Sequence, residues 1–518
     1  MDITPAALVD TVPGTKHAGT RKQIRGSSLL LVGRFLSMAV NLGVQVLTVN
    51  YLSKTDYGAF AYALSMVALG ETIVTFGLDR AITRFVPIFD EQRDYAKLFG
   101  TLLLVLSTFL SLGFAIVVLV YGFQGLIVQQ VIDDQLAATL LLILIALSPV
   151  QALDTLLTGM FAVFASPRAI FFRRYLLAPG LKLGIVVLLI LGHKDVFFLA
   201  GGYLVASILG VAIYMVILFR VLRDQGLFRH FDPRTIRVPA RDILAFTIPL
   251  LSSDLMYTVM NAFAVLMLGY FQSASDVAAL RAVQPTAKLN EFVLASFGLL
   301  FTTSAARLFA RDDREGINNL YWQNAIWIAV VSFPIFALSF SLAQPLTLAL
   351  YGERYADSAT ILALLSIGYY FSAALGQNGL TLKVYGKVRY VVAINILAVL
   401  VNLGINLLLI PRYGALGAAI GTSGTLIAHN IFKQAGLRLG TGISLFERRY
   451  LKVYLIIALS ALGLLLVQIM TSSHIFVSFV LAALVSLLVV WLNRKSLNVG
   501  QVFPELLRFP MLRRVFGE

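Results

Sequence analysis

Eight ionisable side chains fall inside strongly apolar segments of this 518-residue chain. A charge in the middle of a bilayer is costly, so such groups are paired with one another or have a function. Six of the eight lie in the first, second, seventh and eighth apolar segments, which predicts a charged site formed by these four segments. The eight are Arg34, Glu71, Asp154, Lys182, Asp254, Arg281, Lys288 and Glu291.

The eighth segment, at about 277–305, carries two cations in one line. Arg281, Lys288 and Glu291 follow at spacings of seven and three residues, which places them on one helix face. Two cations one above the other suit an anion that moves along a cavity, because phosphate binds Arg in bidentate geometry and accepts Lys as a point charge. Two alternatives stay open: Lys288 pairs with Glu291 or Asp254, and Arg281 extends to the outer surface.

A polar stripe also follows the first segment. Arg34, Asn41 and Gln45 lie within about 20° of one line on a helix. Arg34 and Glu71 of the second segment have similar depths in the membrane. The alternatives for Arg34 are therefore an ion pair with Glu71, extension to the inner surface, or a role in binding an anion.

The seventh segment, at about 243–269, carries a matching polar face of Asp254, Tyr257 and Asn261. A carboxylate buried there could exchange a proton or a sodium ion, or could be the counter-charge of a cation such as Lys288. Asp154 is the one acid of its segment and could have either role. Lys182, early in its segment, is expected to extend to the membrane surface.

The elements that position these groups are transmembrane helices. The chain is 59% hydrophobic and 13% charged, with a mean hydropathy of +0.85, whereas about 25% of the residues of a soluble protein are charged. The sequence therefore predicts an all-α polytopic membrane protein with 14 transmembrane helices. The segments are 27–49, 57–78, 98–121, 136–162, 175–191, 196–219, 243–269, 277–305, 321–343, 358–382, 390–410, 415–436, 451–470 and 473–492.

The distribution of basic residues predicts the orientation. With the N-terminus inside, 33 of the 41 Lys and Arg fall on the inner side and four on the outer side. This positive-inside bias predicts that both termini are cytoplasmic. It also accounts for the net charge of +15 by topology and attraction to anionic membrane lipids, so no nucleic acid is expected as a partner.

The chain repeats itself weakly at an offset of 220 residues, which aligns Asn41 with Asn261, Asp56 with Asp276, Glu71 with Glu291 and Arg34 with Asp254. We therefore expect two six-helix lobes in a parallel repeat, with a substrate site between them. The predicted parts are a cytoplasmic N-terminal tail (1–26), an N-lobe (27–222), a basic cytoplasmic linker (223–241), a C-lobe (242–436), two further C-terminal helices (437–492) and a basic cytoplasmic tail (493–518).

The sequence lacks the residues that metal, disulfide and nucleotide-binding sites require. The chain has no Cys, its five His are scattered, and it has no glycine loop with Lys and Ser/Thr to hold a nucleotide phosphate. We expect neither an enzyme nor a bound metal or cofactor. A transport cycle would then be driven by H+ or Na+, by the membrane potential, or by the substrate gradient.

Four stretches resemble the polysaccharide (Wzx-type) flippases of the multidrug/oligosaccharidyl-lipid/polysaccharide (MOP) exporter superfamily. The likeness covers the first twelve predicted helices. The stretches are Tyr51-Leu52-Ser53 to Asp56-Tyr57-Gly58, Gly77-Leu78 to Arg84-Phe85, Ile248-Pro249-Leu250, and Pro411-Arg412-Tyr413-Gly414-Ala415-Leu416-Gly417-Ala418-Ala419.

The resemblance implies alternating access, with undecaprenyl-diphosphate-linked oligosaccharide moving from the cytoplasmic to the outer leaflet of the bacterial cytoplasmic (inner) membrane during synthesis of cell-surface polysaccharide. Polysaccharide polymerase and assembly proteins would be further partners. We expect three sets of residues to serve this function: Arg34, Lys288 and Arg281 for the diphosphate; Asn41, Gln45, Tyr257 and Asn261 for the sugars; and Glu71, Asp154, Asp254 and Glu291 for charge balance or ion coupling.

Two alternatives of other kinds stay open. The first is an ion-coupled drug or metabolite antiporter of the same fold, in which the acids would recognise a cation. The second is a non-transporting membrane scaffold that binds polysaccharide assembly enzymes through its basic inner loops and tail.

Overall fold

The computed structural model describes residues 33–126, 134–164, 170–471 and 474–497, and within them the side chains of 249, 250, 252–254, 256, 257, 261, 299 and 300 are not described. The described residues form helices joined by short turns and contain no strand. Long apolar runs fold in this way because a helix satisfies its own backbone hydrogen bonds inside a bilayer.

The first half of the chain forms one group of helices. It begins with an unlabelled helix at 33–51. It continues with α2 (Lys54–Thr75), α3 (Asp79–Glu91), α4 (Tyr95–Gly122), α5 (Gln124–Leu126), α6 (Gln135–Leu144), α7 (Leu147–Phe164), the π-helical turn η2 (Phe172–Leu177), α9 (Ala178–Leu191) and α10 (Val196–Asp224).

The short helix η3 (Leu227–His230) packs on α10, and the long helix α11 (Ala240–Phe271) follows it. The second half of the chain then forms another group, which comprises α12 (Ala274–Lys288), η4 (Leu289–Glu291), α13 (Phe292–Ala310), α14 (Arg314–Phe336), η5 (Ala337–Ser341), α15 (Ala343–Tyr351), η6 (Glu353–Tyr355), α16 (Ser358–Ala374), α17 (Asn378–Val384) and α18 (Val388–Thr441). The chain then continues through η7 (Arg448–Tyr450), α19 (Leu451–Thr471), α20 (Ile475–Leu492) and α21 (Arg494–Leu497).

Ten helices or helical runs in the described part of the chain are long and apolar enough to cross a membrane, and eleven if the bent run through α12 and α13 is one span. Every predicted segment is mostly helical where it is described, with non-helical breaks at 76–78, 145–146, 342 and 375–377. Two predicted segments, 390–410 and 415–436, lie within α18, whose backbone is non-helical at Gly414 (φ 53°, ψ −131°). The all-α membrane fold is confirmed, whereas the exact number of fourteen spans stays a prediction.

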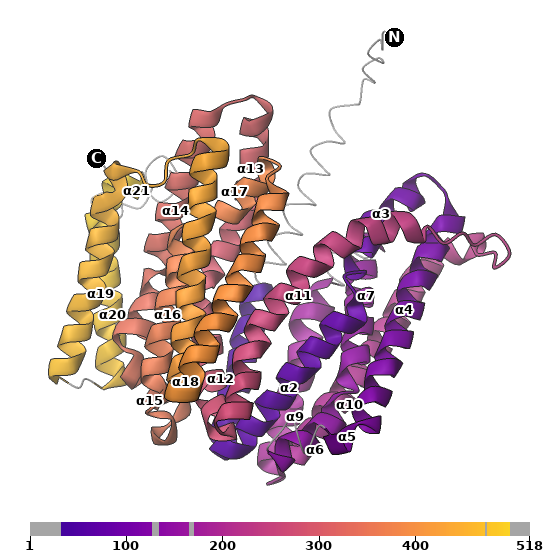
Figure 1. Ribbon diagram of the computed structural model, residues 1–518, viewed down its shortest axis with the longest axis horizontal. Helices are drawn as coiled ribbons and strands as arrows, with labels where there is room; N and C mark the ends of the chain where they lie inside the picture. Colours follow the sequence, from indigo (N-terminus) through magenta and orange to yellow (C-terminus); the bar gives the residue numbers. More distant parts are fainter. Residues whose placement is uncertain (1–32, 127–133, 165–169, 472–473, 498–518) are drawn as a thin grey trace.

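The two groups of helices form a V (Figure 1), which we call the first lobe (33–224) and the second lobe (274–441). The groups converge at the end where α15 and the start of α12 lie, and diverge at the end where α3 and α13 lie. The last two long helices, α19 and α20, pack on the side of the second lobe that faces away from the first.

The two ends of the V differ in charge. The diverging end carries α3, with Arg80 and Arg84, and the connection from α13 to α14, with Arg311 in the turn and Arg314 at the start of α14. The positive-inside rule therefore predicts that the V opens toward the cytoplasm. We call the converging end the outer end.

The long helix α11 contributes to two hydrophobic cores. Near its start, Ile243 is fully buried in the core of the first lobe, together with Val86 and Leu222. Near its end, Val265 and Leu268 are buried in a core shared by both lobes. The helix runs between the two groups and packs against α2 and α18.

The repeat predicted from the sequence is visible at two helix starts. The hydroxyl oxygen of Ser53 accepts a hydrogen bond from the backbone N–H of Asp56 and caps α2. Ser273 caps α12 in the same way, with Asp276 as the donor, 220 residues later. Both helices then break before a second helix begins: α2 at residues 76–78 and α12 at η4.

Candidate substrate pathway between the lobes

The cations of α12 lie where this helix packs against α2 of the first lobe. The Arg281 guanidinium donates one hydrogen bond to Ser65 Oγ of α2 at 2.7 Å and another to Gln284 Oε1 at 2.8 Å. The sequence left open whether Arg281 extends to the outer surface. The structure instead uses it to connect the two lobes.

Gln45 of the first helix belongs to the same contact. Its side-chain amide donates to the hydroxyl of Tyr57 and to the backbone carbonyl of Arg281, the latter at 3.3 Å. Its predicted companion Asn41 donates to the carbonyl of Ser37, one turn earlier in its own helix, at 2.7 Å. In this conformation Gln45 therefore lies in the contact between the lobes, whereas Asn41 is exposed.

Lys288 and Glu291 lie further from the outer end, where α12 gives way to η4. Lys288 interacts electrostatically with both Arg281 and Glu291. Glu291 in turn accepts a hydrogen bond from Ser372 of α16 and interacts with Lys433 of α18. Two cations of the second lobe, Lys288 and Lys433, thus lie near one carboxylate, and Arg281 adds a third positive charge near Lys288. This excess of positive charge can attract an anion.

Lys433 was not predicted as a site residue, although it falls within the apolar segment predicted at 415–436. In the structure it lies within α18, beside Gly379, whose added Cβ would be 3.7 Å from the Lys433 ammonium. The signal that could have found it is its position before the end of the apolar segment at 415–436.

Arg34 contacts the second lobe. Its guanidinium carbon lies 5.7 Å from the centroid of the Phe292 ring, and the neighbouring Phe35 ring is 4.5 Å from the same ring. Glu71, the alternative partner of Arg34, interacts instead with Lys182 and Asp154 in the first lobe. The structure therefore does not contain the predicted alternative of an ion pair between Arg34 and Glu71.

Asp154 was predicted to be a lone acid, and this is wrong. Its carboxylate forms an ion pair with the buried guanidinium of Arg173 in η2. The same guanidinium donates to Thr158 Oγ1 at 2.5 Å and to the backbone carbonyl of Asp154 at 2.9 Å. Hydropathy predicts that the next helix begins at residue 175, which leaves Arg173 outside it.

Lys182 was expected to extend to the membrane surface, and this is also wrong. Its ammonium lies 5.8 Å from the centroid of the Tyr203 ring and interacts with Asp154 and Glu71. Asp154 and Lys182 line a cavity of about 140 Å³ within the first lobe, with Tyr214 at its wall. Each lobe thus holds a mixed cluster of cations and acids.

The remaining predicted residues are on α11. The side chains of Asp254, Tyr257 and Asn261 lie outside the described part of the structure. On the same helix, Thr258 Oγ1 accepts a hydrogen bond from Thr72 Oγ1 of α2 at 3.0 Å. The described residues contain no group of three or more His, Asp or Glu that could hold a metal ion.

The lobes are fastened at the outer end by a set of contacts that we call the outer junction. Lys54 of α2 pairs with Asp357 at 2.7 Å. Arg354 donates to the carbonyls of Val49, at 2.8 Å, and Asn50. The Asn50 amide donates to the carbonyl of Leu350 at 2.6 Å.

Close backbone packing accompanies these polar contacts. An added Cβ at Gly58 of α2 would lie 1.7 Å from the carbonyl oxygen of Ala274, the first residue of α12. Only glycine fits this approach of the two helices. Lys54 and Arg354 lie between predicted segments and were not predicted as site residues.

Comparison with known proteins adds to this geometry. Residues 24–302, more than half of the chain, match the family described as "Polysaccharide biosynthesis protein". The chain belongs to the polysaccharide biosynthesis protein family. Residues 249–408 also match the MatE family, and the two matches with the shared fold place the chain in the MOP superfamily. Members of this superfamily are membrane transporters and flippases.

Relatives of this family member with known structures share its fold. The lipid II flippase MurJ, in an inward closed conformation, is 16% identical, with a TM-score of 0.70 over 90% of this chain and 99% of that chain. An inward-facing multidrug resistance MATE family transporter is 16% identical, with a TM-score of 0.66 over 78% and 94%. An uncharacterized membrane protein of Methanocaldococcus jannaschii is 22% identical over 77% of this chain and 81% of its own.

Proposed function

We propose that this protein is a flippase that moves undecaprenyl-diphosphate-linked oligosaccharide from the cytoplasmic to the outer leaflet of a bacterial cytoplasmic membrane. The observation that carries the proposal is the position of Arg281 and Lys288, which follow one helix at the boundary of the two lobes. Membership of a polysaccharide biosynthesis family supports a saccharide as the cargo.

Alternating access would move the head group along this line of cations. In the conformation described here the outer junction is fastened and the V opens at the other end, which suits entry of a diphosphate from the predicted cytoplasmic side. Lys288, Lys433 and Arg34 would attract the diphosphate first. Arg281 would receive it once its hydrogen bond to Ser65 breaks and the outer end opens.

The acids of the two clusters would balance these cations between cycles. Glu291 lies among Lys288 and Lys433, and Glu71 lies near Lys182. We propose that one such carboxylate takes up the coupling H+ or Na+ when the cationic groups turn to the substrate. Asn41, Gln45, Tyr257 and Asn261 would meet the sugars. Polysaccharide polymerase and assembly proteins would receive the product outside.

The test is transport by the purified protein in liposomes. A fluorescent undecaprenyl-diphosphate oligosaccharide is reconstituted with wild type, Lys288→Ala and Lys194→Ala, and its movement is measured as quenching by an impermeant reductant. Lys194 is the matched control, since it is an exposed lysine near the outer end. We expect Lys288→Ala to lose at least about tenfold in rate, because a hydrogen bond to a charged group contributes about 1.5–3 kcal/mol. Wild-type rates in Lys288→Ala would contradict the diphosphate role.

One observation favours a second candidate, an ion-coupled drug antiporter. Residues 249–408 match the MatE family as well. The same liposomes should therefore also be loaded with a cationic dye. Movement of the dye without movement of the lipid-linked sugar would replace the flippase proposal with the antiporter, and Glu71 and Glu291 would become the residues to test.

A further inference from the structure

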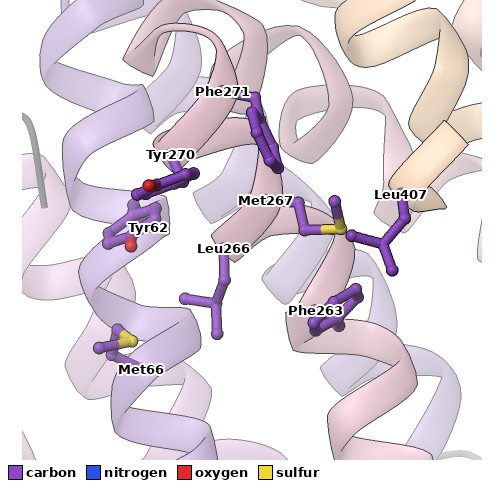
Figure 2. Close-up of a pocket in the computed structure, with 8 residues that line it drawn as sticks. All are labelled: Tyr62, Met66, Phe263, Leu266, Met267, Tyr270, Phe271 and Leu407. Atoms are coloured by element: carbon purple, nitrogen blue, oxygen red, sulfur yellow. The ribbon is translucent and has the colours of Figure 1, made fainter. Parts of the chain in front are cut away.

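An apolar pocket of about 340 Å³ lies between three helices at the boundary of the lobes. Tyr62 and Met66 come from α2 of the first lobe, five residues come from α11, and Leu407 comes from α18. Figure 2 shows their side chains around a common space, with Tyr62 and Tyr270 on one side and Met267 and Leu407 on the other. The volume is within the range of small-molecule binding sites.

The pocket lies in the outer half of the membrane. Phe263, its deepest residue on α11, is eight residues before the outer end of that helix, or about 12 Å at 1.5 Å per residue. Met66 is twelve residues from the outer start of α2, or about 18 Å. A hydrocarbon core is about 30 Å thick, so the pocket extends through the level of the outer leaflet and reaches about the bilayer centre.

Its lining selects for hydrocarbon. None of the eight lining residues is charged, and the hydroxyls of Tyr62 and Tyr270 are their only side-chain polar groups apart from two methionine sulfurs. Tyr62 and Met267 are buried and form the floor, whereas Tyr270 and Leu407 are 59% and 49% exposed and form the rim. Methionine side chains adapt to irregular apolar ligands, and aromatic rings give them firm walls.

The pocket adjoins the cation that would meet a diphosphate near the outer end. Ser65, the hydrogen-bond acceptor of Arg281, directly precedes Met66 on α2. Successive residues point about 100° apart around a helix that is about 10 Å wide. The Arg281 guanidinium and the pocket are therefore about one helix width apart, on neighbouring faces of α2.

We propose that this pocket, the tail pocket, binds the isoprenoid chain of the substrate next to its diphosphate as the head group reaches the outer end. This rests on the proposed flippase function and deepens it. The tail pocket holds the first isoprene units while Arg281 holds the diphosphate. The hydrophobic effect contributes little to contacts between apolar groups inside a membrane, so van der Waals fit decides what binds there. The tail pocket thereby distinguishes a branched prenyl chain from the straight acyl chains of bulk phospholipids by shape.

The first test is photolabelling of the wild-type protein in liposomes. One probe is undecaprenyl diphosphate with a diazirine on its first isoprene unit, and the other is phosphatidic acid with a diazirine in an acyl chain. Peptide mass spectrometry should find the prenyl probe on residues 62–66 and 263–271, at least about tenfold above the acyl probe and displaced by unlabelled undecaprenyl diphosphate. Equal labelling by both probes, or prenyl labelling elsewhere only, would overturn the proposal.

The second test fills the tail pocket. Leu407→Trp adds bulk at the rim, and Leu408→Trp is its control on the same helix, because Leu408 is 71% exposed and does not line the pocket. We expect Leu407→Trp to slow flipping of the undecaprenyl substrate by about fivefold to a hundredfold. An analogue that carries a straight alkyl chain in place of the isoprenoid should move at the same rate in wild type and in both variants, because the tail pocket does not hold such a chain.

The outcomes separate this inference from the proposed function. Wild-type rates in Leu407→Trp, or equal losses for the prenyl and the straight alkyl chain, would overturn the tail pocket and leave the flippase intact. If wild type moves no lipid-linked sugar at all, the flippase proposal fails on its own, and the photolabelling then tests prenyl binding at the pocket separately.

Discussion

The outer junction makes a quantitative prediction about conformational balance. Replacing Arg354 by Ala should open the outer end far more than replacing Lys54 by Ala, although both side chains are cations at the same boundary. Arg354 donates to two backbone carbonyls of the first lobe, whereas Lys54 makes one ion pair, with Asp357. The order of the two effects therefore tests whether the contacts act as the structure implies.

The size of each expected population shift follows from the type of contact that is lost and from how exposed that contact is to solvent. Hydrogen bonds from a charged donor contribute about 1.5–3 kcal/mol, so Arg354→Ala should shift the populations of closed and open outer ends by about 10- to 150-fold. The Asp357 carboxylate is 60% exposed. Because exposed ion pairs contribute about 0–1 kcal/mol, Lys54→Ala should shift the populations by less than about fivefold.

The absence of cysteine makes the assay direct. Thr55→Cys and Ala356→Cys, both exposed and on opposite sides of the outer junction, can carry spin labels without background. Double electron–electron resonance then gives the fractions of short and long distances in nanodiscs. The control is Arg412→Ala, which removes another exposed cation near the outer turn of α18.

Two results would refute the reasoning. If Arg354→Ala and Lys54→Ala give the same fraction of long distances, the contacts to the carbonyls of Val49 and Asn50 do not hold the end closed. If Arg412→Ala opens the outer end as much as Arg354→Ala, the effect comes from net charge and not from these hydrogen bonds.

Three further predictions concern packing and charge. Gly58→Ala should force α2 away from the first carbonyl of α12, destabilise the closed outer end by about 1–3 kcal/mol, and lengthen the same spin-label distance. Asp154→Ala should lower the thermal unfolding temperature in detergent more than Arg173→Ala, because the acid is 42% exposed but the guanidinium left behind is 5% exposed. Asp94→Ala should remove about 1 kcal/mol of stability by uncapping α4. Hydrogen bonds from Lys97 lower the pKa of Asp94, so this difference should persist above about pH 4 and vanish as pH falls through the lowered pKa.

Each of these predictions has a contrary result. An unchanged spin-label distance in Gly58→Ala would mean that the helices relax around the methyl group. A larger loss for Arg173→Ala would show that the carboxylate is the more dependent partner of the ion pair. A stability difference for Asp94→Ala that grows toward pH 3 would have the wrong sign for a carboxylate with a lowered pKa.

Much of the fold could be predicted from the sequence, because hydropathy acts over local windows. The described parts of the apolar segments are mostly helical, and the 220-residue offset finds two helix caps of the same type at Ser53 and Ser273. The helix ends were predicted less well. Arg173 lies in a π-helical turn that hydropathy reads as a loop, and Lys433 lies inside α18.

Contacts between distant parts of the chain could not be predicted in this way. Lys54 and Asp357 are 303 residues apart, and Arg354 binds carbonyls that no side-chain pattern reveals. The partner of Asp154 is on another helix, so its pairing depended on packing and not on spacing. The line of Arg281 and Lys288 was predicted because both residues belong to one helix.

The two cores served by α11 have a consequence for how the protein could be divided. A break in the basic linker before residue 240 would cut the chain between the two lobes. The first fragment would then lack Ile243, which is part of the core of the first lobe. A break after α11, between Gln272 and Ser273, leaves that helix covalently joined to the first fragment. Split-protein complementation should therefore recover more assembled protein with the later break. The place where the chain can be divided would then be set by which helices pack together, and not by the position of its longest loop.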